Sequence, residues 1–370
     1  MKRIMVLLLT FSILFLSQLL FSQTIWKGYE HLFTPVQNYL VYQTKVPVLI
    51  DGKADEPDWG KAEWTADFAD IEGANKPKPL FRTRMKMLWD ESSLYLLAEL
   101  EEPNIWAYYE THDQVVYHEN DIEVFIDPDG DTHNYYEYEL NARNTLFDLL
   151  MPQPYRNGGQ AKISWNSEGF QSAVSIDGTL NDPSDQDKKW TVEMKIPFSD
   201  LHNGDQVQVP SDGQIWKIDF SRVEWRTEVI DGKYQKMKDP STGRAYPEYN
   251  WVWSPTGLIN MHYPERWGMI QFSKLKVGSK SVNFKMPAEE EIINYLWLVY
   301  YKQQNFRHQH QRYATNLEEL EIGKNNEFKV NLTATAVQFT VHMEAKDGSV
   351  LTINETGLFR KSQKLKPMKK

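Results

Sequence analysis

Acidic side chains alternate along two short stretches with strand-like patterning, and they are the clearest chemical signal in the chain. Asp121 and Glu123 share one face of the first stretch, because successive side chains of a strand point to opposite sides. Glu137 and Glu139 share a face of the second stretch. Carboxylates grouped in this way can accept hydrogen bonds from hydroxyl groups. They can also act as the acid and base of a glycosidase when they lie about 5 to 9 Å apart.

A third polar face is predicted on the stretch 221–226. Arg222, Glu224 and Arg226 alternate there with other residues, and Asn141 extends the acidic face of the preceding stretch. If these strands are neighbours in one sheet, their polar stripes merge into a platform on which guanidinium groups offset carboxylates. Planar polar side chains of this kind form paired hydrogen bonds to vicinal hydroxyl groups. A solvated outer face of the sheet is the alternative interpretation.

Three further carboxylates alternate in the turn 127–131. The oxygen atoms of Asp127, Asp129 and Asp131 have the density that a hard cation such as calcium requires. Tyr138 takes the position of the closing glutamate of an EF-hand loop, so that motif is incomplete. A structural calcium site and an ordinary hairpin turn therefore both remain open, and no other cofactor is predicted.

The stretches that carry these residues belong to a long β-rich region. From residue 46 to 275, short alternating runs are separated by turn signals such as the Asp-Gly pair at 51–52. This rhythm is typical of a β-sandwich, and the lack of helical runs disfavours a parallel α/β sheet. Residues 276–287 have the composition of a linker. Residues 288–360 predict a helix and short strands, a small C-terminal α/β extension, followed by a basic tail over 361–370.

Residues 1–22 have the pattern of a signal peptide. Lys2 and Arg3 precede a long apolar run, and Ser22 supplies a small residue at the cleavage position. We therefore predict export in a bacterium, to the periplasm, the cell surface or the medium, with residues 23–45 as a lead-in. An uncleaved membrane anchor is the alternative, since the run is near the minimum length for a span. We expect no membrane span after cleavage.

Composition narrows the classes of function. The 370 residues include 51 acidic residues against 41 Lys and Arg, and the net charge of −10 leaves no general basic field for nucleic acid. Cysteine is absent, which removes disulfides and thiolate nucleophiles. The 13 Trp and 19 Tyr suit either a β-rich core or a surface that stacks flat rings. The sequence contains no indication of oligomeric state.

Three segments resemble, in order and spacing, the family 9 carbohydrate-binding module and its exported relatives. They are Val48-Leu-Ile-Asp51-Gly52-Lys-Ala-Asp55, Met87-Leu-Trp89-Asp90 and Asn120-Asp121-Ile-Glu123-Val-Phe125. The resemblance covers roughly residues 46–272. It implies an antiparallel β-sandwich that binds an oligo- or polysaccharide without cleaving it, in proteins that accompany polysaccharide breakdown. Structural calcium is also common in related modules.

The resemblance also implies site residues, one position at a time. The family's binding carboxylate matches Glu123, its strand asparagine matches Asn141, and one aromatic residue of its clamp matches Tyr117. Glu139 stands where the family has an arginine, and the second clamp residue falls near Met261 or His262. We hypothesise that Arg222 supplies the missing guanidinium. The predicted carbohydrate-binding residues are therefore Tyr117, Glu123, Glu139, Asn141, Arg222 and His262.

Other functions remain as alternatives. A glycoside hydrolase of the xylanase type would use two of the strand carboxylates, but no sequence feature around them indicates a raised pKa. An enzyme is therefore not favoured, and if the chain is one, it hydrolyses O-glycosyl bonds. A surface interaction or structural protein could keep the fold without the ligand. Haem binding, found in the wider superfamily, needs axial ligands from two sides of a pocket, and the adjacent Met261 and His262 do not supply them.

Overall fold

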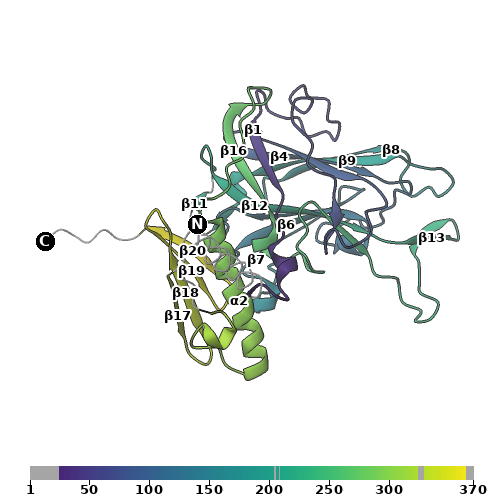
Figure 1. The fold of residues 1–370 in the computed structure, drawn as a ribbon. Helices are drawn as coiled ribbons and strands as arrows, with labels where there is room; N and C mark the ends of the chain where they lie inside the picture. Colours follow the sequence, from purple (N-terminus) through teal and green to yellow (C-terminus); the bar gives the residue numbers. More distant parts are fainter. Residues whose placement is uncertain (1–24, 204–205, 208, 324–328, 364–370) are drawn as a thin grey trace, which may run out of the picture. The chain divides into compact units, whose positions relative to one another are not determined.

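The computed structural model describes residues 25–203, 206–207, 209–323 and 329–363, so the predicted signal peptide and most of the basic tail lie outside the described residues. The chain divides into two compact units. One contains Pro35–Lys285, and the other combines the chain up to Thr34 with the segment from Met286 onward. Figure 1 shows the strands of the first unit and the helix and strands of the second.

The larger unit is built on a 12-stranded sheet with the main order β7-β6-β5-β12-β16-β1-β3-β4-β9-β8. Its strands are β1 (Asn38–Gln43), β2 (Ala69–Asp70), β3 (Thr83–Trp89), β4 (Ser93–Glu101), β5 (Asp121–Asp127), β6 (Tyr135–Asn141), β7 (Leu146–Met151), β8 (Gln171–Asp177), β9 (Lys189–Pro197), β12 (Ile215–Glu224), β15 (Tyr249–Val252) and β16 (Gly268–Lys276). β15 pairs with β12, and β2 pairs with β15. The predicted mainly-β class is confirmed.

Shorter elements complete the two units. Two small hairpins pair β10 (His202–Asn203) with β11 (Gln206–Val207) and β13 (Thr227–Ile230) with β14 (Lys233–Lys236). Single turns of 3-10 helix are η1 (Glu30–Phe33), η2 (Val116–His118), η3 (Tyr155–Asn157), η4 (Phe198–Asp200), η5 (Pro264–Arg266) and η6 (Glu318–Leu320). Among them, η2 and η3 bear directly on the candidate site, because each presents a tyrosine.

One strand of the sheet departs from the sequence prediction. β1 lies inside the segment 23–45, for which the sequence predicts only a lead-in, and it pairs in parallel with both β16 and β3. Figure 1 shows β1 beside β16. The described pairings elsewhere in the sheet are antiparallel. β1 escapes prediction because its partner β16 lies more than two hundred residues away, and a parallel pair needs no hairpin turn beside it.

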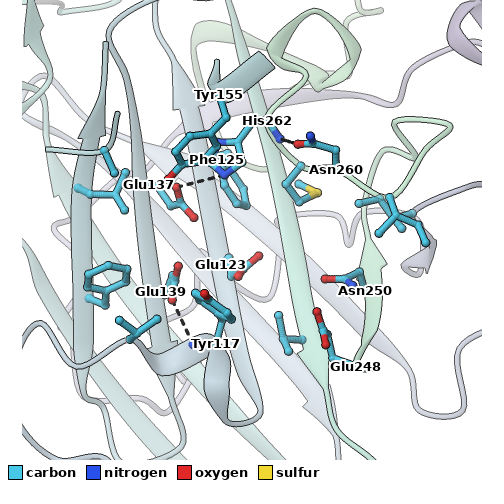
Figure 2. A pocket seen from close by; sticks show the side chains of 18 of the residues that line it. Tyr117, Glu123, Phe125, Glu137, Glu139, Tyr155, Glu248, Asn250, Asn260 and His262 are labelled. Atoms are coloured by element: carbon cyan, nitrogen blue, oxygen red, sulfur yellow. Dashed lines mark hydrogen bonds and ion pairs between the residues drawn. The ribbon is translucent and has the colours of Figure 1, made fainter. Parts of the chain in front are cut away.

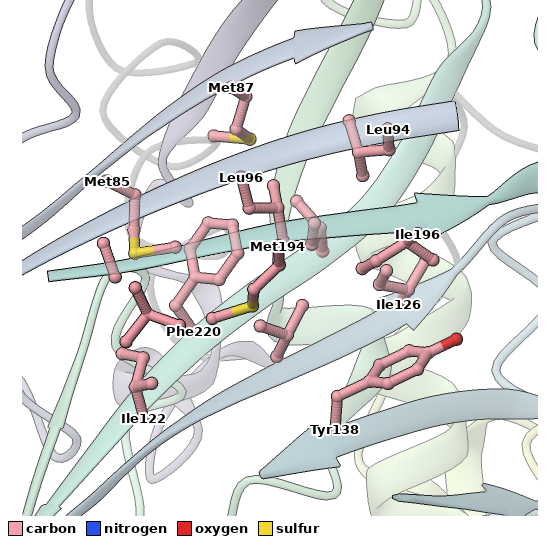
Figure 3. Close-up of a cluster of buried hydrophobic side chains, with 14 of the residues drawn as sticks. Met85, Met87, Leu94, Leu96, Ile122, Ile126, Tyr138, Met194, Ile196 and Phe220 are labelled. Carbon is pink, nitrogen blue, oxygen red and sulfur yellow. The ribbon is translucent and has the colours of Figure 1, made fainter. Parts of the chain in front are cut away.

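The sheet folds back on itself, so that the inner faces of its two halves share one core. Ile122 and Phe220 from one half pack in the same apolar cluster as Leu96 and Met194 from the other (Figure 3). All four side chains are fully buried. Because burying one such side chain contributes about 1.5 to 3 kcal/mol, this shared core is the main force that holds the two halves together.

The smaller unit contains one described α-helix and a four-stranded sheet. Helix α2 (Glu290–His310) packs on the sheet formed in order by β17 (Val330–Ala334), β18 (Phe339–Glu344), β19 (Ser349–Asn354) and β20 (Phe359–Gln363). The predicted C-terminal extension of a helix and short strands is therefore confirmed. The start of the predicted basic tail belongs to β20. Within the described residues, no helix has the length and apolar character needed to span a membrane.

A carboxylate-lined pocket on the outer face of the sheet

The strand alternation predicted for β5 and β6 places their acidic residues together. Ile122 faces the shared core, so Glu123 faces outward, away from it. The antiparallel register sets Glu123 opposite Glu139, and Phe125 opposite Glu137. These four side chains therefore form one continuous patch on the outer face of the sheet.

A pocket of about 540 Å³ lies over this patch. Its walls come from β5, β6 and β7, from the segments 248–250 and 259–262, and from the two 3-10 turns η2 and η3. Figure 2 shows the carboxylates of Glu123, Glu137 and Glu139 directed into the space between these walls. Asn250 and Asn260 add amide groups at the side. The pocket thus combines hydrogen-bonding groups with aromatic and aliphatic walls, as ligand sites usually do.

Tyr117 stands at the edge of the pocket with its backbone held in place. Its N–H donates to an Oε2 of Glu139 at 3.2 Å, and its carbonyl oxygen accepts from the indole N–H of Trp225 at 3.0 Å. The side chain is 40% exposed, so the ring offers a free face at the pocket mouth. The sequence prediction that Tyr117 belongs to the site agrees with this position.

His262 lies at the opposite end of the pocket. Its Nδ1 is 2.8 Å from the Tyr135 hydroxyl, and its Nε2 is 4.0 Å from Glu137 Oε2. Burial, aided by the charge of Arg156, lowers the pKa of His262 to about 4, so the ring is neutral near pH 7. It can therefore exchange hydrogen bonds with a ligand but cannot neutralise the carboxylates.

Tyr155 is a second exposed aromatic residue of the pocket, and sequence analysis missed it. Its ring centroid lies 4.5 Å from that of His262 in an edge-on arrangement, and the residue is 47% exposed. It belongs to η3, a single turn that follows β7 and has no strand or helix periodicity. The only available signal was a tyrosine placed between a proline and an Asn-Gly pair, which marks a surface turn.

Burial changes the acid–base behaviour of the patch. It raises the pKa of Glu123 to about 7, and burial together with the charge of Glu123 raises the pKa of Glu137 to about 8. The pKa values of Asp121 and Glu139 are also well above their usual range, chiefly through burial and then through the charge of Glu123. Near neutral pH the patch therefore holds protons that can be donated to a ligand, a property that no feature of the sequence indicates.

The prediction that Arg222 shares this face is wrong. The register pairs Ser221 with Glu123 and Arg222 with Ile122, so Arg222 lies on the core side of β12. Alternation alone separates the residues of a strand into two sets, but it does not say which set faces the core. The register with β5 decides this, and it directs the guanidinium away from the pocket.

Arg222 instead forms a buried ion cluster beneath the sheet. Its Nη2 lies 2.8 Å from carboxylate oxygens of both Glu102 and Glu224, and its Nη1 donates to the Thr83 hydroxyl at 3.0 Å. The guanidinium also lies 5.3 Å from the ring centroid of Trp251. Every strong donor of Arg222 is thus used inside the fold, and none is available to a ligand.

Asn141 also does not line the pocket. Its amide donates to the backbone oxygen of Tyr109 at 2.9 Å and to Glu119 at 3.2 Å. Its carbonyl oxygen accepts from the N–H groups of Arg143 and Thr145, both at 3.0 Å. Asn141 therefore fixes the chain behind the pocket. Of the predicted binding residues, the pocket brings together Tyr117, Glu123, Glu139 and His262.

The turn after β5 does gather its three aspartates. One carboxylate oxygen from each of Asp127, Asp129 and Asp131 lies within 4.8 Å of the others. Both oxygens of Asp127 already accept backbone N–H groups, from Gly130 at 2.9 Å and Thr132 at 2.8 Å. The turn is therefore closed by its own hydrogen bonds, and calcium binding at this position stays a prediction.

This fold and pocket define a candidate ligand-binding β-domain, and comparison with known proteins gives its family. The chain belongs to the carbohydrate family 9 binding domain-like family, whose model matches residues 50–251. The predicted family resemblance is confirmed. It rests on the sheet that carries the pocket, since the matched residues extend from the segment before β3 to β15.

Two relatives are polysaccharide-degrading enzymes by name. Endo-1,4-beta-xylanase A of Thermoanaerobacterium saccharolyticum is 28% identical over 180 residues, which is 49% of this chain and 12% of the enzyme. Exoglucanase XynX of Acetivibrio thermocellus is 29% identical over 161 residues, 44% of this chain and 12% of the enzyme. The chain thus spans about an eighth of the length of these relatives.

Solved structures with a similar outline include a putative carbohydrate-binding protein from Bacteroides uniformis, at 17% identity and a TM-score of 0.45. That match covers 65% of this chain and 100% of the other. A family 9 carbohydrate-binding module from Caldicellulosiruptor kristjanssonii in complex with cellotriose has 17% identity and a TM-score of 0.37, over 67% of this chain and 98% of the module. A family 9 carbohydrate-binding module from the same organism has also been solved in complex with glucose.

Proposed function

We propose that this chain is an exported, non-catalytic carbohydrate-binding protein and that the pocket is its sugar site. One observation carries the proposal: in a member of this family, Tyr117 and Tyr155 flank a pocket whose base is formed by Glu123 and Glu139. Aromatic faces pack against the apolar face of a sugar ring, while carboxyl and amide groups bind its hydroxyls. An oligo- or polysaccharide is therefore the partner that this geometry fits.

The proposal also covers the type of β-fold, the cellular location of the protein and the process in which it takes part. We infer that the curled sheet is the antiparallel β-sandwich expected for the family, and the core shared by its two halves supports this. The signal pattern at residues 1–22 supports export to the periplasm, the cell surface or the medium. The names of the two enzyme relatives support a link to polysaccharide breakdown.

Hydrolysis of O-glycosyl bonds is the second candidate, because the raised pKa values of Glu123 and Glu137 would suit a general acid. One observation favours binding over hydrolysis: the matched segment is only 12% of each enzyme relative.

Calorimetry with glucose, cellotriose and xylo-oligosaccharides tests the proposal. We expect one sugar site per chain, weakened about tenfold or more by Tyr117→Ala and by Glu123→Ala. Unchanged binding in both variants would contradict the assignment of the pocket. Absence of binding to every sugar would favour a structural or interaction protein instead. Reducing-sugar release from xylan or cellulose that Glu123→Ala abolishes would establish the hydrolase.

A further inference from the structure

A buried carboxylate beneath the pocket is missing a partner. Asp121 lies on β5 two positions before Glu123, and its side chain is completely buried. One oxygen from each of Asp121, Glu123 and Glu139 lies within 4.8 Å of the others, and we call these three residues the floor cluster. Oδ1 of Asp121 accepts only a long bond of 3.3 Å from Val223 N–H, and its Oδ2 makes no hydrogen bond.

A second orphan oxygen points into the same space from outside the floor cluster. Glu137 is 5% exposed and lines the pocket, and its Oε2 makes no hydrogen bond. Figure 2 shows its carboxylate directed toward the pocket interior beside Glu123 and Glu139. A buried carboxyl oxygen without a partner is costly, and a positive ligand that displaces its proton would satisfy it.

Among the described residues that line the pocket there is no Lys and no Arg. Arg156 lies behind His262 and donates to its backbone oxygen at 3.2 Å and to Glu265 at 2.8 Å. Within the lining, the basic side chain of His262 has its Nε2 4.0 Å from Glu137. Arg222, which sequence analysis placed here, lies on the other side of β12 and is held by Glu102 and Glu224. The carboxyl groups therefore have no Lys or Arg partner in the described lining, and a cation that binds there displaces the protons that they hold near neutral pH.

We propose that the floor cluster binds a divalent cation of the calcium type through Asp121, Glu123 and Glu139. Calcium binds oxygen at about 2.3 to 2.6 Å, so three oxygens within 4.8 Å of one another need shifts of at most about a few tenths of an ångström to reach one ion. Magnesium fits less well, because it requires about 2.0 to 2.1 Å in a strict octahedron. Three carboxylates leave several of the six to eight calcium positions open toward the pocket.

The open positions give the ion a role in ligand recognition, a step that rests on the proposed function. Two vicinal hydroxyl groups of a sugar can bind one calcium ion as neutral oxygen ligands. A sugar held between Tyr117 and Tyr155 would present its hydroxyls toward the floor cluster, since both rings line the same pocket. The ion would then bridge the carboxylates and the sugar.

The ion site is tested by calorimetry of the chelator-treated full chain with CaCl2 and, separately, MgCl2. An Asp131→Asn background weakens the independent aspartate turn, so that the pocket ion can be counted alone. We expect one calcium per chain, with weaker magnesium binding. Adding Glu139→Gln should weaken calcium binding more than about tenfold, because loss of even an outer-shell partner has that effect. Adding Glu228→Gln, the same change at an exposed position of β13, should leave it unaltered.

Two measurements keep this test decisive. Circular dichroism checks that Glu139→Gln is folded, and Gln retains an oxygen that can accept the N–H of Tyr117. Terbium luminescence, sensitised by nearby aromatic side chains, should follow the same order among the variants. Calcium binding that Glu139→Gln does not change, or no calcium binding by the folded background protein, overturns the ion site.

Sugar titrations separate this inference from the proposed function. We expect cellotriose to bind at least about tenfold more tightly with calcium than with chelator. Calcium binding without any sugar binding contradicts the proposed function and supports the ion site. Sugar binding without calcium binding supports the proposed function and contradicts the ion site. Equal sugar affinity with calcium and with chelator overturns the bridging role.

Discussion

Glu123 on β5 and Glu139 on β6 lie directly opposite each other across neighbouring strands, and both side chains face one pocket. Like charges in this position destabilise a sheet. The fold tolerates them because burial keeps protons on the patch and because the pocket is open to a ligand. The opposed pair therefore lowers the stability of the ligand-free protein, and a ligand bound in the pocket can offset this loss.

Replacing Glu139 by Gln should stabilise the chain when no divalent cation is present. The change removes one of two opposed carboxylates and keeps an oxygen to accept the N–H of Tyr117. We expect an increase of about 1 kcal/mol in the free energy of unfolding in chelator at pH 8, measured by urea denaturation. A lower stability of the variant would show that opposition to Glu123 is not the dominant effect.

Removing the ring of Tyr155 should weaken sugar binding. Tyr155→Ala takes away an exposed aromatic face of the pocket, and we expect about a tenfold higher Kd for cellotriose by calorimetry. Tyr108→Ala is the matched control, since Tyr108 is 39% exposed and is not among the pocket residues. Equal losses in both variants would point to a general effect on folding rather than to contact with the sugar.

Arg222→Met should destabilise the larger unit without acting on the pocket directly. It leaves the buried carboxylates of Glu102 and Glu224 without their 2.8 Å partner, a change that typically costs about 3 to 5 kcal/mol. Urea denaturation measures this loss. Adding Glu102→Gln and Glu224→Gln should recover part of it. Sugar affinity per folded molecule should stay at the wild-type value, and a selective loss of affinity would restore Arg222 as a binding residue.

Asp219 on β12 should make stability fall as pH rises. Burial holds its pKa well above the usual value, so between the unfolded and folded pKa values the folded state binds the extra proton. The contribution of Asp219 to stability is therefore greatest below the unfolded pKa and is lost as pH rises through the folded pKa. The loss is about 1.4 kcal/mol for each pH unit that separates the two pKa values.

The variant Asp219→Asn tests whether the contribution of Asp219 to stability falls as pH rises. Its amide oxygen can still accept the N–H groups of Phe220 and Ser254, each 2.9 Å from Asp219 Oδ1. The stability of the variant relative to wild type should rise between pH 5 and pH 8 in thermal or urea unfolding. Asp231→Asn, at an exposed turn, is the control and should show no such trend. A constant difference between Asp219→Asn and wild type would refute the prediction.

Alternation along β5 and β6 was sufficient to predict which carboxylates meet. It failed on β12, where Arg222 is polar but points toward the core, because a buried ion cluster and a solvated face look alike in sequence. Tyr155 could not be found in this way, since its position depends on a turn that packs against His262, more than a hundred residues later. The raised pKa values likewise depend on walls from 248–250 and 259–262, which no local pattern around Glu123 or Glu137 reveals.

The parallel pairing of β1 with β16 determines how the larger unit responds to tension. β1 lies near the start of this unit and β16 near its end, and the two strands run side by side in the same direction. A pull applied at both ends therefore slides one strand along the other and loads their cross-strand hydrogen bonds together, rather than peeling them apart one at a time. The unit is therefore built to resist stretching between its ends.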